Sequence, residues 1–120
     1  MPQQPLKSNF ISKSVVGAGR PKTVTDIQYT LTLKDQGLWL RMIPASPGEL
    51  IVPNDVDVDF PINAQVTVEQ SGGNAVTIIQ ASGVTVNSAG ANMVTNGQYA
   101  VFGLTKVGPN EWTAFGNLTT

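Results

Sequence analysis

Short runs in which apolar and polar residues alternate recur along most of this 120-residue chain. The clearest runs lie at 65–70 and 75–80, separated by Ser71-Gly-Gly-Asn74, and a third follows at 84–86. Period-two alternation rich in Val, Ile and Thr, interrupted by Gly, Ser and Asn, is typical of antiparallel strands joined by tight turns. The pattern predicts a hairpin across 65–86 at the centre of the protein. The apolar side chains predicted to share its inner face are Val66, Val68, Val76, Ile78, Val84 and Val86.

The remaining runs extend this sheet. Tyr29, Leu31 and Leu33 are expected on one face of a strand, followed by a hairpin turn at 34–37, whose Gly tolerates the positive φ that such turns need. Trp112 is expected to pack into the body. The expected fold is all-β, with about eight short strands in a small antiparallel β-sandwich or jelly-roll-like body. A helical turn is expected only around 32–36. The other predicted strands and their connections lie at 23–25, 38–43, 49–52, 98–107, 108–110 and 111–115.

The first 22 residues differ from the rest of the chain in pattern and in charge. Pro2, Pro5 and Pro21 interrupt them, and no helical or strand period appears, so we expect an extended N-terminal arm at 1–22 and a β-rich body at 23–120. The arm carries a net charge of +4 and the body −5. Such an arm suits an acidic protein surface, and its basic residues are not interleaved with aromatic ones, so no nucleic-acid partner is expected.

Composition excludes several kinds of chemistry. The chain contains no His and no Cys, which removes the usual general base, the thiol nucleophile and most zinc or copper sites. Charged residues make up 12% of the chain, against roughly 25% in an ordinary soluble domain, as suits a protein packed against others. We expect no enzyme activity and no cofactor. No segment approaches the 18 or so apolar residues of a membrane helix, so we expect synthesis in a cytoplasm, without secretion, and no membrane partner.

Three aspartates recur at every second position in the segment 54–59. Asp55, Asp57 and Asp59 would share one face of an extended segment, and clustered carboxylates are the ligands that calcium prefers. The positions where an EF-hand requires Gly and Glu hold Phe60 and Val66 instead. The pattern leaves two interpretations open, a calcium site and a solvated edge whose charges discourage stray strand pairing.

A series of short motifs across residues 29–118 resembles a module of tailed-bacteriophage structural proteins, found in head-decoration (cement), head-fibre and tail-fibre proteins. In that module a strand, an Asp-Gly turn and an Arg-Met strand lead to a Phe-Pro bend, a Val-Thr hairpin and a final strand containing Trp. The matching stretches are 29–42, Val52-Pro-Asn54, Phe60-Pro-Ile62, 66–70, 83–88, Gln98-Tyr99 and 112–118.

The resemblance implies a virion protein that is β-rich, trimeric and without enzyme activity. Fibre versions usually follow a long shaft, whereas here a short arm precedes the module, so we expect a decoration protein on the capsid surface, bound to the major capsid protein. The alternative is a tail- or head-fibre component that recognises a host glycan or receptor through loops 54–59 and 87–96. A monomeric carbohydrate-binding module is a third possibility. Contacts with the shell are expected from Lys7, Phe10, Ile11, Lys13, Val15, Val16 and Arg20, and trimer contacts from Trp39, Tyr99 and Phe102.

Overall fold

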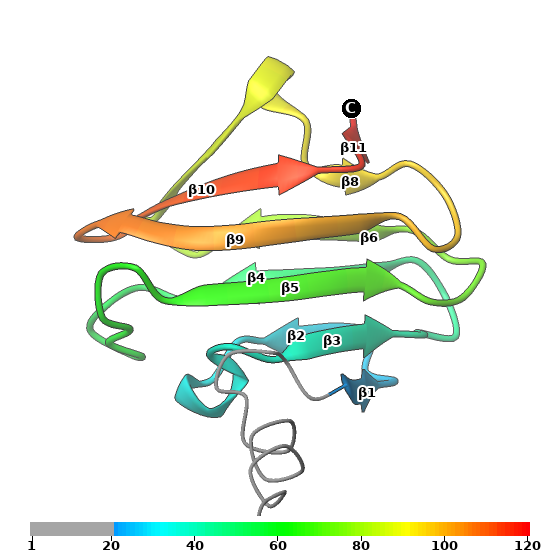
Figure 1. Cartoon of the computed structure of the whole chain (residues 1–120), viewed down its shortest axis with the longest axis horizontal. Coiled ribbons are helices and arrows are strands. Elements are labelled where there is room, and N and C mark those ends of the chain that lie inside the picture. Colours follow the sequence, from blue (N-terminus) through cyan, green and yellow to red (C-terminus); the bar gives the residue numbers. More distant parts are fainter. Residues whose placement is uncertain (1–20) are drawn as a thin grey trace, which may run out of the picture.

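The computed structural model describes residues 21–120, which form two packed β-sheets. Figure 1 shows the sheets as two layers, with β5 and β9 in front of β4 and β6. Sheet A contains, in spatial order, β1 (Pro21–Val24), β3 (Trp39–Met42), β5 (Gln65–Gln70), β9 (Val101–Gly108), β10 (Glu111–Gly116) and β7 (Thr85–Ser88). Sheet B contains β11 (Leu118–Thr119), β8 (Val94–Thr95), β6 (Val76–Gln80), β4 (Gly48–Val52) and β2 (Gln28–Thr30). Two short 3-10 helices connect strands, η1 (Leu33–Asp35) and η2 (Ala89–Ala91).

The first six strands wind between the sheets instead of forming hairpins. The chain runs from β1 in sheet A to β2 in sheet B, returns to β3 in sheet A, and continues in this way through β6. Each strand therefore lies parallel to the strand two places later, as in β1 with β3, β3 with β5, and β4 with β6. This half of the protein is a stack of three coils.

The last five strands complete both sheets. β9 pairs antiparallel with β5 and with β10, and β8 pairs antiparallel with β6. β7 lies parallel to β10 at the edge of sheet A. Of the nine strand pairings in the described part of the chain, five are parallel. The expected all-β fold with two layers is confirmed, and the expected antiparallel pairing is wrong for more than half of the ladders.

Two predicted hairpins are corrected by this winding. The segments 65–70 and 76–80 lie in different sheets, so Ser71-Gly-Gly-Asn74 carries the chain across the layers. The turn at 34–37 likewise connects sheet B to sheet A. Alternation specifies which side chains of a strand face inward. Those side chains are buried equally well whichever of the two sheets the strand joins. The pattern therefore does not distinguish a hairpin from a crossing to the opposite sheet.

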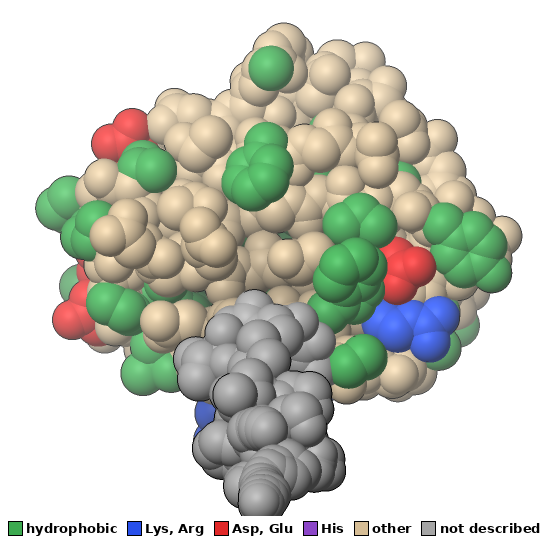
Figure 2. Space-filling view, viewed as in Figure 1, with side chains coloured by type: hydrophobic (Ala, Val, Ile, Leu, Met, Phe, Trp, Pro, Cys, Tyr) green, Lys and Arg blue, Asp and Glu red, His purple; other side chains and the backbone are tan. Residues whose placement is uncertain are grey.

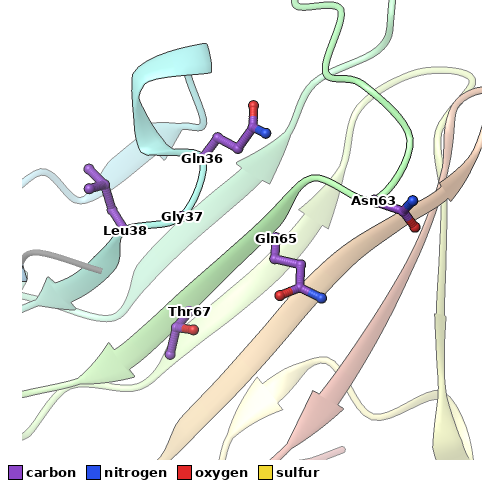
Figure 3. Close-up of a pocket in the computed structure, with 6 residues that line it drawn as sticks. All are labelled: Gln36, Gly37, Leu38, Asn63, Gln65 and Thr67. Carbon is purple, nitrogen blue, oxygen red and sulfur yellow. The ribbon is translucent and has the colours of Figure 1, made fainter. Parts of the chain in front are cut away.

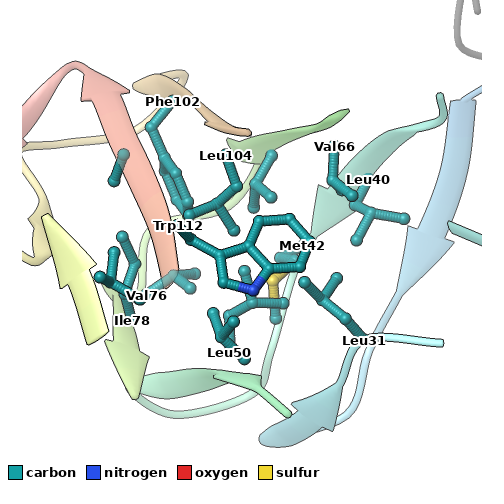
Figure 4. Close-up of a cluster of buried hydrophobic side chains, with 14 of the residues drawn as sticks. Leu31, Leu40, Met42, Leu50, Val66, Val76, Ile78, Phe102, Leu104 and Trp112 are labelled. Atoms are coloured by element: carbon teal, nitrogen blue, oxygen red, sulfur yellow. The ribbon is translucent and has the colours of Figure 1, made fainter. Parts of the chain in front are cut away.

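The core lies between the two layers and follows the predicted alternation. Leu40 and Met42 of β3, and Leu50 and Val52 of β4, are fully buried from opposite sides. Trp112 is fully buried among them, as expected, and its ring meets Phe60 edge-on with centroids 5.2 Å apart. Figure 4 shows the indole surrounded by aliphatic side chains from both sheets. All six residues predicted to share the inner face of 65–86 are buried.

Other local predictions have mixed outcomes. The final hairpin, β9 and β10 joined through Pro109 and Asn110, is confirmed, and so is the helical turn, which is η1. Leu33 is 52% exposed, contrary to expectation, because the chain leaves the extended conformation at η1 and the alternation ends there. The described part of the chain, 21–120, contains eleven strands, more than expected, since several are only two to four residues long. No helix within 21–120 has the length and apolar character that a membrane crossing requires.

Candidate functional site

The outer face of sheet A carries the exposed aromatic side chains that strand alternation turns away from the core. Trp39, Thr67, Gly103 and Phe115 form one row across four neighbouring strands. Arg41, Glu69 and Val101 form the next row. Figure 2 looks onto this face and shows separate hydrophobic groups on a surface that is mostly polar and uncharged, with one acidic and one basic side chain side by side. We consider this face in two parts.

The first part, the Trp39 patch, consists of Trp39, Arg41, Glu69, Tyr99 and Val101. The Trp39 indole Nε1–H donates to Glu69 Oε1 at 3.0 Å, and Arg41 Nε donates to the same oxygen at 3.3 Å. The indole N–H is the largest cause that holds the pKa of Glu69 below its usual value, and the guanidinium is one of the smaller causes in the same direction. The half-buried Trp39 ring is therefore fixed in orientation on the outer surface.

Tyr99, which lies in the turn before β9, has a strained conformation. Its φ is +69°, a region that bulky side chains rarely adopt, and its ring is 63% exposed. Its backbone N–H donates to the carbonyl of Gln70 at 2.6 Å, which fixes the segment to the end of β5. A strained backbone that holds a large aromatic ring in solvent is typical of a residue whose ring contacts a binding partner.

Phe102 does not belong to this surface. It is 1% exposed and packs in the core, because it lies on β9 between the outward-facing Val101 and Gly103. The prediction that Phe102 contributes to a trimer interface is therefore corrected: alternation turns its side chain inward. Of the other two residues of that prediction, Trp39 lies on the outer face of sheet A, and Tyr99 is exposed in the turn that precedes β9.

The residues predicted to contact the capsid shell lie outside the described part of the chain. These are Lys7, Phe10, Ile11, Lys13, Val15, Val16 and Arg20. The boundary of the arm shifts slightly, because β1 begins at Pro21, so that Lys22 belongs to sheet A and lies opposite Leu40.

The second part, the amide groove, is an uncharged hollow at the other end of β5. Its volume is about 210 Å³, and it is lined by Gln36, Gly37, Leu38, Asn63, Gln65 and Thr67. Figure 3 shows that Gln65 and Thr67 project from β5 to the same side, and that Gln36 and Asn63 come from two neighbouring segments. Thr67 lies on β5 with Gln65, Gln36 follows η1, and Asn63 ends the loop before β5 with a φ of +77°. None of these four polar side chains forms a hydrogen bond to another group within residues 21–120. The backbone N–H and C=O groups of the neighbouring segments do bond to each other.

A second hollow of about 160 Å³ continues the amide groove across the sheet. It shares Gln65 and Thr67 with the first and reaches Val101, Gly103 and Phe115. The Phe115 ring lies directly over Gly103, where a Cβ would come within 2.5 Å of Phe115 Cζ. Gly103 therefore provides a flat floor against which a 57% exposed aromatic ring rests.

A third hollow of about 170 Å³ lies on the far side of Phe115 and differs in its polar groups. Ser88 Oγ donates to the Asn92 carbonyl, and Asn92 Nδ2 donates to the Leu118 carbonyl. This hollow includes part of the predicted recognition loop 87–96. Its side-chain donors are already used within the protein, in contrast to those of the amide groove.

Two further clusters of charge are structural. Asp35 is fully buried and accepts from Lys22 Nζ at 3.0 Å, from Tyr29 Oη at 2.7 Å and from the Thr32 backbone N–H at 2.9 Å. Burial raises the pKa of the Tyr29 hydroxyl, and donation to Asp35 has the same direction, so that hydroxyl remains a donor. Hydrogen bonding to Tyr29 and Asp35 raises the pKa of Lys22.

The second cluster settles what Asp55 does. Lys106 is 2% exposed, and its Nζ donates to Asp55 Oδ1 and to the Phe60 carbonyl, each at 2.6 Å. The Lys106 ammonium and the Asn110 backbone N–H hold the pKa of Asp55 below its usual value. Residues 21–120 contain no group of three or more His, Cys, Asp or Glu side chains that could hold a metal ion. Asp55 is thus the partner of a buried lysine, and Asp57 remains exposed.

Sequence reasoning missed the amide groove and the buried Lys106. A signal for the groove was present, since Gly103 interrupts an alternating strand at an outward position and an aromatic residue follows on the next strand. No protein-family model matches the chain, and comparison with curated proteins finds no similar sequence.

Proposed function

We propose that this chain is a bacteriophage capsid decoration protein, which binds the head shell as a trimer and attaches through its N-terminal residues. The observation that supports an assembly role best is the Trp39 patch. It combines an indole held by Glu69, a strained and exposed Tyr99, and two charges that cancel, those of Arg41 and Glu69. Exposed aromatic side chains of this kind are favoured at protein interfaces.

The titratable groups of the body favour the same class. Asp35 and Lys106 are buried in hydrogen-bonded pairs that connect segments of the fold, and Glu69 is engaged by Trp39 and Arg41. Groups committed in this way stabilise structure instead of acting on a substrate. The resemblance of residues 29–118 to phage structural modules supplies the identity of the assembly.

The uneven distribution of charge along the chain supports attachment to the shell through the N-terminal residues. Residues 1–20 carry Lys7, Lys13 and Arg20 and no acid, a net +3, whereas residues 21–120 carry four basic and eight acidic residues, a net −4. A basic, proline-broken segment with isolated apolar residues suits an extended contact with an acidic shell. Three such segments joined in one trimer would give slow release from modest individual contacts.

The test is co-sedimentation of purified protein with emptied heads of the phage that encodes it. Deletion of residues 2–20 should lower head binding by about 100-fold or more, because attachment by three arms is lost together. The trimer should persist in sedimentation velocity. Changing Lys7, Lys13 and Arg20 to Gln should weaken binding and reduce its dependence on salt, whereas Lys34→Gln in the body should not. Head binding by the deletion variant equal to that of the intact chain would rule out attachment through the arm.

The proposed trimer has its own test. Tyr99→Asn removes the ring while keeping a residue that tolerates positive φ, and Trp39→Ser removes the indole. Both variants should sediment as monomers with unchanged circular dichroism. Phe115→Ala, which removes an exposed ring from the same face outside the patch, is the control and should remain trimeric. If both patch variants stay trimeric, the interface lies elsewhere.

The alternative proposal, a fibre component that recognises the host, makes the opposite prediction. Purified protein should then block adsorption of the phage to its host, and particles that lack the protein should resist heating as well as complete particles do.

A further inference from the structure

We infer that the amide groove and the adjoining Phe115 ring form a binding site for a neutral oligosaccharide. This inference does not rest on the decoration proposal, because it concerns the other part of the outer face of sheet A and involves no residue of the arm. The structure supports it through the kind of polar groups present, their lack of partners within the described residues, and the aromatic ring beside them.

The polar lining matches the hydrogen-bonding capacity of sugar hydroxyls. The side-chain amides of Gln36, Asn63 and Gln65 each offer two donors and an acceptor, and Thr67 adds a hydroxyl. A sugar hydroxyl is both donor and acceptor, so it pairs with either end of an amide. These side chains form no bonds within residues 21–120, so a ligand would not have to break any bond made by the described part of the chain.

The lining of the two hollows is uncharged, which favours neutral ligands over charged ones. No Lys, Arg, Asp or Glu lines either hollow. An anionic polymer, such as a nucleic acid or a sulfated glycan, would lose its hydration without gaining a counter-charge, which is unfavourable. A neutral polyhydroxylated ligand has no such cost, so we commit to a neutral saccharide.

Phe115 supplies the apolar half of such a site. Its ring is supported from below by Gly103 and is 57% exposed. The C–H face of a pyranose is weakly positive and packs against the negative face of an aromatic ring. Thr67 and Phe115 are both paired with Gly103, so about two strand spacings, roughly 10 Å, separate their backbones.

The dimensions favour an extended ligand. The two hollows measure about 210 and 160 Å³ and meet at Gln65 and Thr67. Each is smaller than the roughly 300–1,000 Å³ pockets that enclose drug-sized molecules. We therefore expect successive sugar units of a linear chain to lie across β5, β9 and β10, with modest affinity at each single site.

The experiment uses the full chain labelled with ¹⁵N and four neutral probes: maltohexaose, cellohexaose, mannohexaose and chitohexaose. At millimolar concentration at least one probe should saturably shift the side-chain NH₂ signals of Gln36, Asn63 and Gln65. The NH₂ signals of Gln28 and Asn74, which are bonded to Glu49 and to the Pro44 carbonyl, should not move. Heparin fragments should leave all five unchanged.

Matched variants separate this site from a general surface effect. Gln65→Ala should lower affinity at least about tenfold, because two hydrogen bonds are lost. Gly103→Ala should do the same without removing a polar group, since its Cβ displaces the Phe115 ring. Gln28→Ala and Gly97→Ala, where a Cβ meets nothing within 4 Å, should bind normally.

The outcomes divide cleanly. Saturable binding that is lost in Gln65→Ala and in Gly103→Ala supports the site. The inference is overturned if none of the four probes binds, or if binding survives both variants. It is also overturned if Gln65→Ala changes the oligomeric state and no probe binds, because a second copy of the chain then covers the groove. None of these results bears on head binding by the arm.

Discussion

Two buried charges in this protein are stabilised in different ways. Asp35, the last residue of η1, has Lys22 as its ionic partner and also accepts from Tyr29 and from the Thr32 backbone N–H. Lys106, on β9, has Asp55, the Phe60 carbonyl and a distant Asp59 at 3.9 Å. The carboxylate keeps several dipolar donors if its ionic partner is removed. Among residues 21–120, the ammonium would keep the Phe60 carbonyl as its only close partner.

This difference assigns the two sites different sensitivities. A buried charge left without compensation is costly, whereas a charge surrounded by hydrogen-bond donors is partly solvated by the protein itself. We therefore expect the Lys106 site to depend on its ion pair more strongly than the Asp35 site does. It is also the site that connects loop 53–60 to the hairpin of β9 and β10, through Asn110.

The largest expected effect is that of Asp55→Asn, which removes the carboxylate from Lys106. We expect a loss of about 3 kcal/mol in the free energy of unfolding, at the lower end of the range for breaking a buried pair, because Asp55 is 24% exposed. Urea denaturation measures it. Asp57→Asn, an exposed neighbour, should change stability by less than about 0.5 kcal/mol. Equal effects of the two variants would show that the pair is not important for stability.

The next effect is a loss of stability in acid. The folded protein holds the pKa of Asp55 below its ordinary value of 3.8, so this contribution is complete above that pH and is lost as the pH falls through the lowered pKa. Unfolding free energies measured from neutral pH to about pH 2 should decline most steeply below about pH 4. Asp55→Asn should flatten part of that decline, and Asp57→Asn should leave it unchanged. A decline that is identical in both variants would contradict the assignment.

A smaller effect is expected for Lys22→Met. The Lys22 side chain is 40% exposed, so solvent screens the ion pair, and Asp35 retains its bonds to Tyr29 and Thr32. We expect a loss of about 1 kcal/mol, measured by urea denaturation. The control is Lys34→Met, also exposed, which should be nearly neutral. A loss larger than that of Asp55→Asn would reverse the comparison between the two sites.

The smallest effect is expected at the surface pair of Arg41 and Glu69. Arg41 is 46% exposed, and exposed pairs contribute little. Arg41→Gln should change the stability of the isolated body by less than about 0.5 kcal/mol in thermal or urea unfolding. Trimer dissociation, measured by sedimentation, should change more than body stability if the Trp39 patch is an interface.

The sequence predicted local properties well because they depend on side-chain period and turn chemistry. Alternation identified the inward side chains of β5 and β6, and it placed Trp112 in the core. The turn at Pro109 and Asn110 was predictable because consecutive strands of an antiparallel hairpin need only a few residues between them. Leu33 was wrongly placed because alternation was extended through a segment that turns into η1.

The candidate sites were less accessible from the sequence. Trp39, Tyr99 and Phe102 were all predicted at a trimer interface, but Phe102 alternates inward with Leu104 and is buried. The amide groove escaped prediction because Gln36, Asn63 and Gln65 come from separate segments that only the coil stacking brings together. The aspartate series suggested a cation site, whereas the position of Lys106 gives Asp55 a cation from within the protein.

The amino-acid sequence by itself determined an all-β protein, its inward-facing side chains and the charge contrast between residues 1–22 and the body. The tertiary structure decided which strands pair, and it wound the first six into parallel coils across two sheets. The physical reason is that the apolar side chains of an alternating strand can be buried in either sheet. The period therefore determines which side chains face the core, but not which strand lies next to them. The ion pairs of Asp35 and Lys106 form only because of the strand neighbours that the fold brings together. The same holds for the side chains that line the amide groove.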